Sequence, residues 1–181
     1  MVDMIVVGAG AAGLIAAITS ARAGHTVTLL EQNTKIGKKI LVSGNGKCNI
    51  DNKYITTNRF HSQNPDFIEK VLEDFGVDIV EKFFTSIGLE LIEGKEGKMF
   101  PMSLQASSVV ELLEYEAKRV GVQIICDCPV TSISKEADTF TVEFTSLPSS
   151  RQSSCLFLSC PPNAKNCQAL SLGFRWIALP L

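Results

Sequence analysis

The sequence predicts an α/β fold in which a parallel sheet carries a glycine-rich turn, and three observations support this prediction. A short apolar run, 4–7, leads into the turn, and an Ala- and Leu-rich stretch, 11–23, follows it. A second apolar run, 26–30, then ends at an acidic residue. Strand, helix and strand within about 30 residues have the length of a βαβ unit. Its strands are expected to be parallel, with a right-handed crossover.

The later elements follow from caps and apolar periodicity. Residues 32–64 are rich in Gly, Asn, Lys and Thr, so we expect an irregular loop there that is either functional or disordered. Asn64 and Pro65 then begin a helix, because Asn is a favoured N-cap and Pro fits the first helical position. Helices are predicted over 65–75, over 77–87 and from a cap at Ser103 to about 120. Strands are predicted over 89–92, 98–100, 122–126 (a third parallel strand), 130–134 and 140–144 (an antiparallel pair).

Composition excludes several classes of function. The chain has 181 residues, 45% of them apolar, which is ordinary for a globular domain. The net charge of −2 gives no basic footprint for nucleic acid, and no apolar run reaches the ~20 residues of a membrane span. The start of the chain lacks the pattern of a signal peptide. We therefore expect a cytoplasmic protein without nucleic-acid or membrane partners. The six cysteines form no C-x-x-C pair, so no metal site is expected.

The turn after the first strand carries a phosphate-binding motif. It reads G-A-G-A-A-G and matches G-x-G-x-x-G between a strand and a helix, which indicates a Rossmann-type dinucleotide site. The first glycine permits the tight turn, the second lets the pyrophosphate approach the backbone, and the third brings the helix close to the sheet. The helix start then faces the phosphates. The alternative is a glycine-rich turn of another α/β protein. The candidate binding residues are Gly8, Gly10, Ala11, Ala12 and Gly13.

Glu31 closes the second predicted strand, 18 residues after Gly13. A carboxylate at this place accepts hydrogen bonds from the ribose hydroxyls of the adenosine. It would repel a 2′-phosphate, so this site disfavours NADP. The alternative is a solvent-exposed glutamate at a strand end.

A second glycine-rich segment, 35–49, is both basic and polar. Its three glycines, with Ser and Asn, are suited to forming a nest of backbone N–H donors, and its lysines are suited to neutralising a pyrophosphate. A flexible basic loop is an equally good interpretation of these residue types. The candidate residues are Lys38, Lys39, Ser43, Gly44, Asn45 and Gly46.

The same segment carries a resemblance to a known family. Residues 37–49 read G-K-K-I-L-V-S-G-N-G-K-C-N and residues 97–103 read G-K-M-F-P-M-S, followed by Ala106 and Val109-Val110. These motifs resemble those of the BaiN-like, or aminoacetone-oxidase-like, NAD(P)/FAD-dependent oxidoreductases, a bacterial flavoprotein family. Two positions depart from the family pattern: Asp51 replaces Thr, and Lys98 stands where Arg is common. The resemblance covers roughly residues 1–144.

The resemblance implies FAD as the cofactor, with both lysines and the 43–46 turn along it and the backbone of Val130 near the adenine. Residues of about 54–102 would be an insertion in the FAD-binding domain 1–144. Electrons would pass from NAD(P)H through FAD to a small organic substrate or oxygen. Cys48 lacks the second cysteine of a disulfide reductase, so we interpret it as structural. The oligomeric state is not predicted.

The sequence changes character after residue 144. Residues 145–181 contain no Asp or Glu, match no family motif and show no clear strand or helix period. We therefore predict an aberrant or disordered tail that arose from a frameshift, with a divergent C-terminus as the alternative. The chain is then a truncated part of a flavoprotein, and its own activity is not predicted. Two alternatives remain: a stand-alone NAD-binding module and a non-functional gene fragment.

Overall fold

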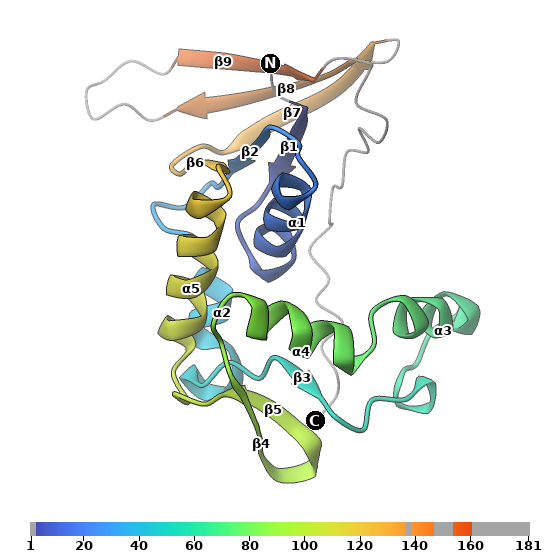
Figure 1. The fold of residues 1–181 in the computed structure, drawn as a ribbon. Coiled ribbons are helices and arrows are strands. Elements are labelled where there is room, and N and C mark those ends of the chain that lie inside the picture. Colours follow the sequence, from blue (N-terminus) through green and yellow to red (C-terminus); the bar gives the residue numbers. More distant parts are fainter. Residues whose placement is uncertain (1–2, 137–138, 147–153, 161–181) are drawn as a thin grey trace. The chain divides into compact units, whose positions relative to one another are not determined.

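The computed structural model describes residues 3–136, 139–146 and 154–160 (Figure 1). These residues form two compact units. Unit 1 comprises residues 3–39 and the described residues between 113 and 160, and unit 2 comprises residues 40–112. The boundary at 112 falls within the helix α5 (Ala106–Arg119).

Unit 1 contains the predicted βαβ unit. Its parallel sheet has the order β1-β2-β6, with β1 (Met4–Val7), β2 (Val27–Leu30) and β6 (Gln123–Ile125). The helix α1 (Ala11–Arg22) connects β1 to β2 and packs against both (Figure 1). All four residues of β2 are buried, as expected for a parallel strand covered on both faces. The structure therefore confirms the α/β fold and the third parallel strand.

The C-terminal end of α1 is fixed by glycine and by an ion pair. The helix closes before Gly24, whose φ of +92° is typical of the residue that ends a helix. In the last turn, Arg22 donates to the carboxylate of Glu116 on the C-terminal half of α5, with a shortest N–O distance of 2.6 Å. Arg119 donates to the same carboxylate, and Glu116 is only 3% exposed.

An antiparallel sheet with the order β7-β8-β9 completes unit 1 (Figure 1). The predicted hairpin is confirmed and is longer than expected, with β7 at Val130–Glu136 and β8 at Thr139–Ser146. Val142 and Phe144 of β8 form a buried cluster with Leu30 of β2 and Cys128. This cluster packs the hairpin against the parallel sheet.

The strand β9 (Ser154–Cys160) pairs with β8 along its whole length, from Phe140↔Cys160 to Ser146↔Ser154. The sequence analysis found no strand in 145–181, so it was wrong for this segment. The apolar run, 155–158, is only four residues long and shows no two-residue alternation. Strand pairing satisfies the backbone without such a pattern. Residues 147–153 and 161–181 lie outside the described residues, and the predicted frameshifted tail stays a prediction there.

Unit 2 begins within α2 (Lys38–Val42) and contains short elements around a small antiparallel sheet of order β3-β5-β4. The segment 54–102 predicted as an insertion lies within it. The helix α3 is capped as predicted, since Asn64 Oδ1 accepts from the N–H of Phe67 at 3.3 Å. The remaining elements are η1 (Ser43–Gly46), β3 (Asp51–Asn52), η2 (Thr57–Arg59), α3 (Pro65–Asp74), α4 (Val77–Ser86), β4 (Leu91–Glu93), η3 (Lys95–Gly97) and β5 (Lys98–Pro101).

Two local predictions are corrected in this part of the chain. The loop 32–64 was expected to be irregular, but it contains α2 and the two-residue strand β3. Ser103 was expected to cap the next helix, but α5 begins at Ala106. The backbone of Leu104 is left-handed, with φ of +53°, so the chain turns between Ser103 and the helix. Among the described residues, no helix is both long and apolar enough to cross a membrane.

Candidate dinucleotide-binding site

The glycine-rich turn joins β1 to the start of α1. Gly8 ends the strand with φ of +95° and donates its N–H to the carbonyl of Leu30 at 2.7 Å. Gly10 is the N-cap of α1, and the N–H of Leu14 donates to its carbonyl at 2.9 Å. The N–H groups of the first helical turn have no acceptor within the helix, and they lie at the positive end of its dipole. This geometry favours an anion such as a pyrophosphate.

The glycines of this turn are required for different reasons. A Cβ added to Gly13 would overlap the carbonyl oxygen of Gly8, so close contact with the end of the strand excludes any side chain there. A Cβ added to Gly10 would meet no atom within 4 Å, and the φ of −81° at this residue is one that any residue adopts. The fold itself therefore does not require glycine at position 10, whereas a ligand lying on the turn would.

Glu31 lies beside the turn and is only 7% exposed, which contradicts the alternative of a solvent-exposed glutamate. Its N–H donates to the carbonyl of Ile125 and its carbonyl accepts from the N–H of Cys128, so it continues the pairing of β2 with β6. Its Oε2 accepts from the N–H of Ala9 at 2.7 Å. The carboxylate is thus bonded directly to the glycine-rich turn.

The segment after Glu31 folds back onto the same turn. The N–H of Gly37 donates to the carbonyl of Ala9 at 2.8 Å. Lys38 donates its Nζ to Oδ1 of Asn33 at 2.9 Å, and the side chains of Lys38 and Lys39 are exposed. Lys38 is therefore held near Glu31 through Asn33, a residue that the sequence analysis missed. The only signal in the sequence was an amide two residues after the acidic strand end.

Val130 begins β7, which is an edge strand of its sheet in the part of the chain that the structure describes. It pairs with Phe144, and the N–H of Thr145 donates to the carbonyl of Pro129 just outside this pair. In an antiparallel ladder, a hydrogen bond between the two residues that flank a pair identifies it as a non-hydrogen-bonded pair. Val130 and Phe144 are such a pair. The N–H and C=O of Val130 consequently point away from β8, toward the edge.

The second glycine-rich turn, residues 43–48, belongs to unit 2 and closes on itself. Its backbone is left-handed at Gly44 and Asn45, both with φ of 55°. The N–H of Lys47 donates to the carbonyl of Gly44, and the N–H of Cys48 donates to that of Ser43. The N–H groups of Lys47 and Cys48, which follow the predicted residues 43–46, are thus used within the turn. A cofactor contact for Ser43–Gly46 stays a prediction from the sequence.

Cys48 is 7% exposed, and burial raises the pKa of its thiol. A raised pKa keeps the thiol protonated and unreactive at neutral pH. The buried position agrees with a structural role for this cysteine.

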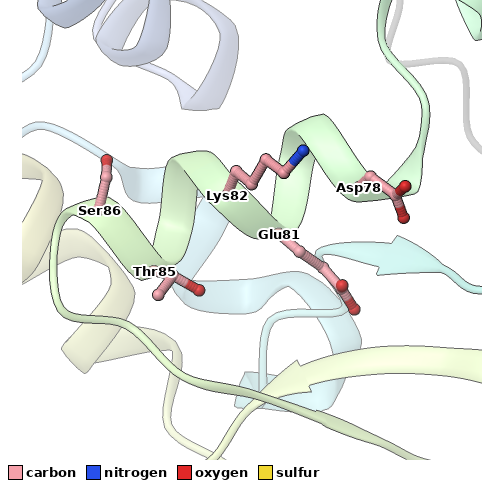
Figure 2. Close-up of a pocket in the computed structure, with 5 residues that line it drawn as sticks. All are labelled: Asp78, Glu81, Lys82, Thr85 and Ser86. Atoms are coloured by element: carbon pink, nitrogen blue, oxygen red, sulfur yellow. The ribbon is translucent and has the colours of Figure 1, made fainter.

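None of the predicted site residues lines the open hollow that the structure shows in unit 2. It is lined by five polar residues of a single helix, α4: Asp78, Glu81, Lys82, Thr85 and Ser86. In Figure 2, Lys82 and Ser86 point to one side of α4, whereas Thr85 and Glu81 point to the other. The side chains do not converge on a common point, so we assign no site to this hollow.

Comparison with known proteins places the chain in a family. A 3-dehydro-bile acid Δ(4,6)-reductase of Clostridium scindens is 40% identical over 139 residues, which are 76% of this chain and 34% of that protein. A ribosomal RNA dihydrouridine synthase of Escherichia coli is 32% identical over 149 residues, 80% of this chain and 36% of that protein. The chain thus spans about a third of the length of these curated relatives.

Solved structures confirm the fold. The 3-ketosteroid-Δ4-(5α)-dehydrogenase of Rhodococcus jostii matches 87% of this chain and 43% of its own, with a TM-score of 0.55 and 15% identity. The model of the HI0933-like protein Rossmann domain matches residues 2–160, which extends beyond residue 144 and includes β9. The chain therefore belongs to the HI0933-like family and carries its Rossmann domain.

Proposed function

We propose that this chain is the FAD-binding part of a flavin-dependent oxidoreductase. The observation that carries the proposal is Gly10, because neither its backbone conformation nor any neighbouring atom requires glycine there. The pyrophosphate of a dinucleotide explains the missing side chain, since its oxygens must come within hydrogen-bond distance of the backbone at this helix start. The turn thus fits the group that the family implies.

The other candidate residues are assigned to parts of the cofactor. Glu31, held at the turn by the N–H of Ala9, has lone pairs left for the ribose hydroxyls of the adenosine. Lys38 and Lys39 add positive charge for the pyrophosphate. The backbone of Val130, at the strand edge, is suited to the donor and acceptor edge of the adenine. The assignment of Ser43–Gly46 rests on the sequence resemblance alone.

When bound, FAD would supply the redox chemistry, and the protein would supply binding, orientation and electrostatics. The residues of this chain have no further assigned role in the reaction. We propose NAD(P)H as the electron donor, in keeping with the BaiN-like motifs, and a small organic molecule as the substrate. The greater identity to the bile acid reductase than to the ribosomal RNA enzyme supports this choice, as does the net charge of −2.

The test is isothermal titration calorimetry, which measures the affinity of the purified chain for FAD, ADP and NAD. We expect binding of FAD and ADP, because both contain the adenosine and pyrophosphate groups. Gly10→Val should abolish binding of both while the chain stays folded, because the new side chain occupies the space for the ligand and costs stability only as a poorer N-cap. The matched control is Thr19→Val, at an exposed position two turns further along α1.

Either of two results would contradict the proposal. One is a wild-type chain that binds neither FAD nor ADP. The other is a Gly10→Val variant that keeps its FAD affinity. Tighter binding of NAD than of FAD would instead support a nicotinamide-binding module.

A further inference from the structure

The side chain of Asn33 connects two predicted ligand-binding groups that carry opposite charges. Its Nδ2 and its own backbone N–H both donate to Oε1 of Glu31. Its Oδ1 accepts from Nζ of Lys38 at 2.9 Å. The amide therefore presents donors to a carboxylate and an acceptor to an ammonium group.

The backbone of Asn33 fixes the position of this amide. Its carbonyl accepts from the N–H of Asp127 at 3.0 Å, just after β6. Glu31 is fixed in turn by Ala9 and by the strand pairing described above. Lys38 has no such support from strand pairing, and its long side chain is exposed. The bond to Asn33 is thus what directs its ammonium group toward Glu31 and the glycine-rich turn.

We propose that Asn33 is a positioning residue for the dinucleotide, because its amide holds the carboxylate meant for the ribose and the ammonium group meant for the pyrophosphate in one network. This inference rests on the proposed function. A neutral amide can serve both groups at once, because it donates at one end and accepts at the other. A carboxylate in its place accepts from Lys38 but cannot donate to Glu31.

This difference provides a test by pH. In Asn33→Asp, the new carboxylate faces that of Glu31 at pH 8, and like charges repel. Once a lower pH adds a proton to the pair, the protonated group again donates to one side and accepts on the other. The other titratable groups nearby are Lys38, Asp127 and Cys126. Burial, and then the charge of Glu31, raise the pKa of the Cys126 thiol, so that it stays neutral.

The experiment measures the FAD and ADP affinities of the wild type, Asn33→Asp and Asn33→Ala at pH 8 and pH 5. At pH 8 both variants should bind about tenfold more weakly than the wild type, as expected for the loss of hydrogen bonds to charged groups. At pH 5 Asn33→Asp should recover most of the wild-type affinity, whereas Asn33→Ala should not. The double variant Asn33→Ala/Lys38→Met should bind within about twofold of the affinity of Asn33→Ala alone. The reason is that the two changes remove the same interaction.

The outcomes separate the two proposals. A wild-type chain that binds neither FAD nor ADP contradicts the proposed function and the role of Asn33 together. A wild type that binds, with Asn33→Asp equal to it at pH 8 or equally impaired at both pH values, contradicts only the positioning role. Recovery at pH 5 in Asn33→Asp alone would show that the protonated carboxyl replaces the amide, because Asn33→Ala offers no group that a change of pH could protonate.

Discussion

The two glycine-rich turns of this chain differ in what their glycines are for. In the first turn, Gly13 avoids a clash with the protein, but Gly10 faces open space. In the second turn, a Cβ on Gly44 would lie 2.6 Å from the backbone nitrogen of Asn49, and the backbone is left-handed. The first turn therefore contains a glycine that only a ligand explains, and the second contains glycines that the turn itself explains.

This difference shows that a glycine-rich composition alone does not indicate a binding site. Both segments were predicted from the sequence to lie along the cofactor. The first segment has its free N–H groups at the start of a 12-residue helix. In the second segment, the N–H groups of Lys47 and Cys48 donate to carbonyls of the same turn. A glycine is evidence for a ligand only where the structure gives it no other reason.

The largest expected effect distinguishes the two glycines of the first turn. Gly13→Ala should lower the free energy of unfolding by about 3 kcal/mol or more, because its Cβ overlaps the carbonyl oxygen of Gly8 and the strand must move. Gly10→Ala should lower it by no more than about 1 kcal/mol, the cost of a poorer N-cap. Urea unfolding followed by circular dichroism checks both. Equal losses of unfolding free energy at the two positions would contradict the conclusion that only Gly13 is required by the fold.

An intermediate effect is expected in the second turn. Gly44→Ala should lower the free energy of unfolding by about 2 kcal/mol, because it adds a contact with Asn49 to a left-handed backbone. Asn45→Ala is the matched control: it shares the φ of 55° but has a Cβ already, so it reports only the preference of asparagine for this conformation. The same denaturation experiment applies. A Gly44→Ala variant as stable as the wild type would show that the turn is free to rearrange.

The smallest effect concerns the ion pair between Arg22 of α1 and Glu116, which stabilises the helix that follows the first turn. Glu116→Gln should lower the free energy of unfolding by about 1 kcal/mol at neutral pH, because both arginines lose a charged partner. Hydrogen bonds from Arg119, and then from Arg22, lower the pKa of Glu116 in the folded state. Its contribution is therefore complete above its unfolded pKa of 4.5 and is lost as the pH falls below that value.

The measurement for Glu116 is the unfolding free energy between pH 7 and pH 3. The gap between wild type and Glu116→Gln should narrow as the pH falls. A gap that stays constant down to pH 3 would mean that the ion pair does not stabilise α1.

Local patterns predicted the parallel sheet well because each element carries its own signal. β2 is a continuous apolar run, the turn is glycine-rich, and Asn64-Pro65 begins a helix by itself. Elements that depend on a partner were missed. β3 has two residues and exists through its pairing with β5, and β9 exists through its pairing with β8.

Within the candidate site, the same distinction holds. Glu31 was predicted because its position at a strand end is a sequence feature. Asn33 was not, because its role depends on bonds to Lys38 and Asp127 that form only when the chain folds back. The closing bonds within the second turn were also invisible in the sequence, because they depend on the left-handed backbone at Gly44 and Asn45.

The bond between the N–H of Ala9 and the carboxylate of Glu31 has a consequence for the motions of the turn. It is made by protein groups alone, and Glu31 is buried and belongs to a paired strand. The amide proton of Ala9 should therefore exchange with solvent only when β2 and β6 separate, and so at a rate close to that of the sheet. A turn held in this way meets its ligand already shaped, and little conformational entropy remains to be lost on binding.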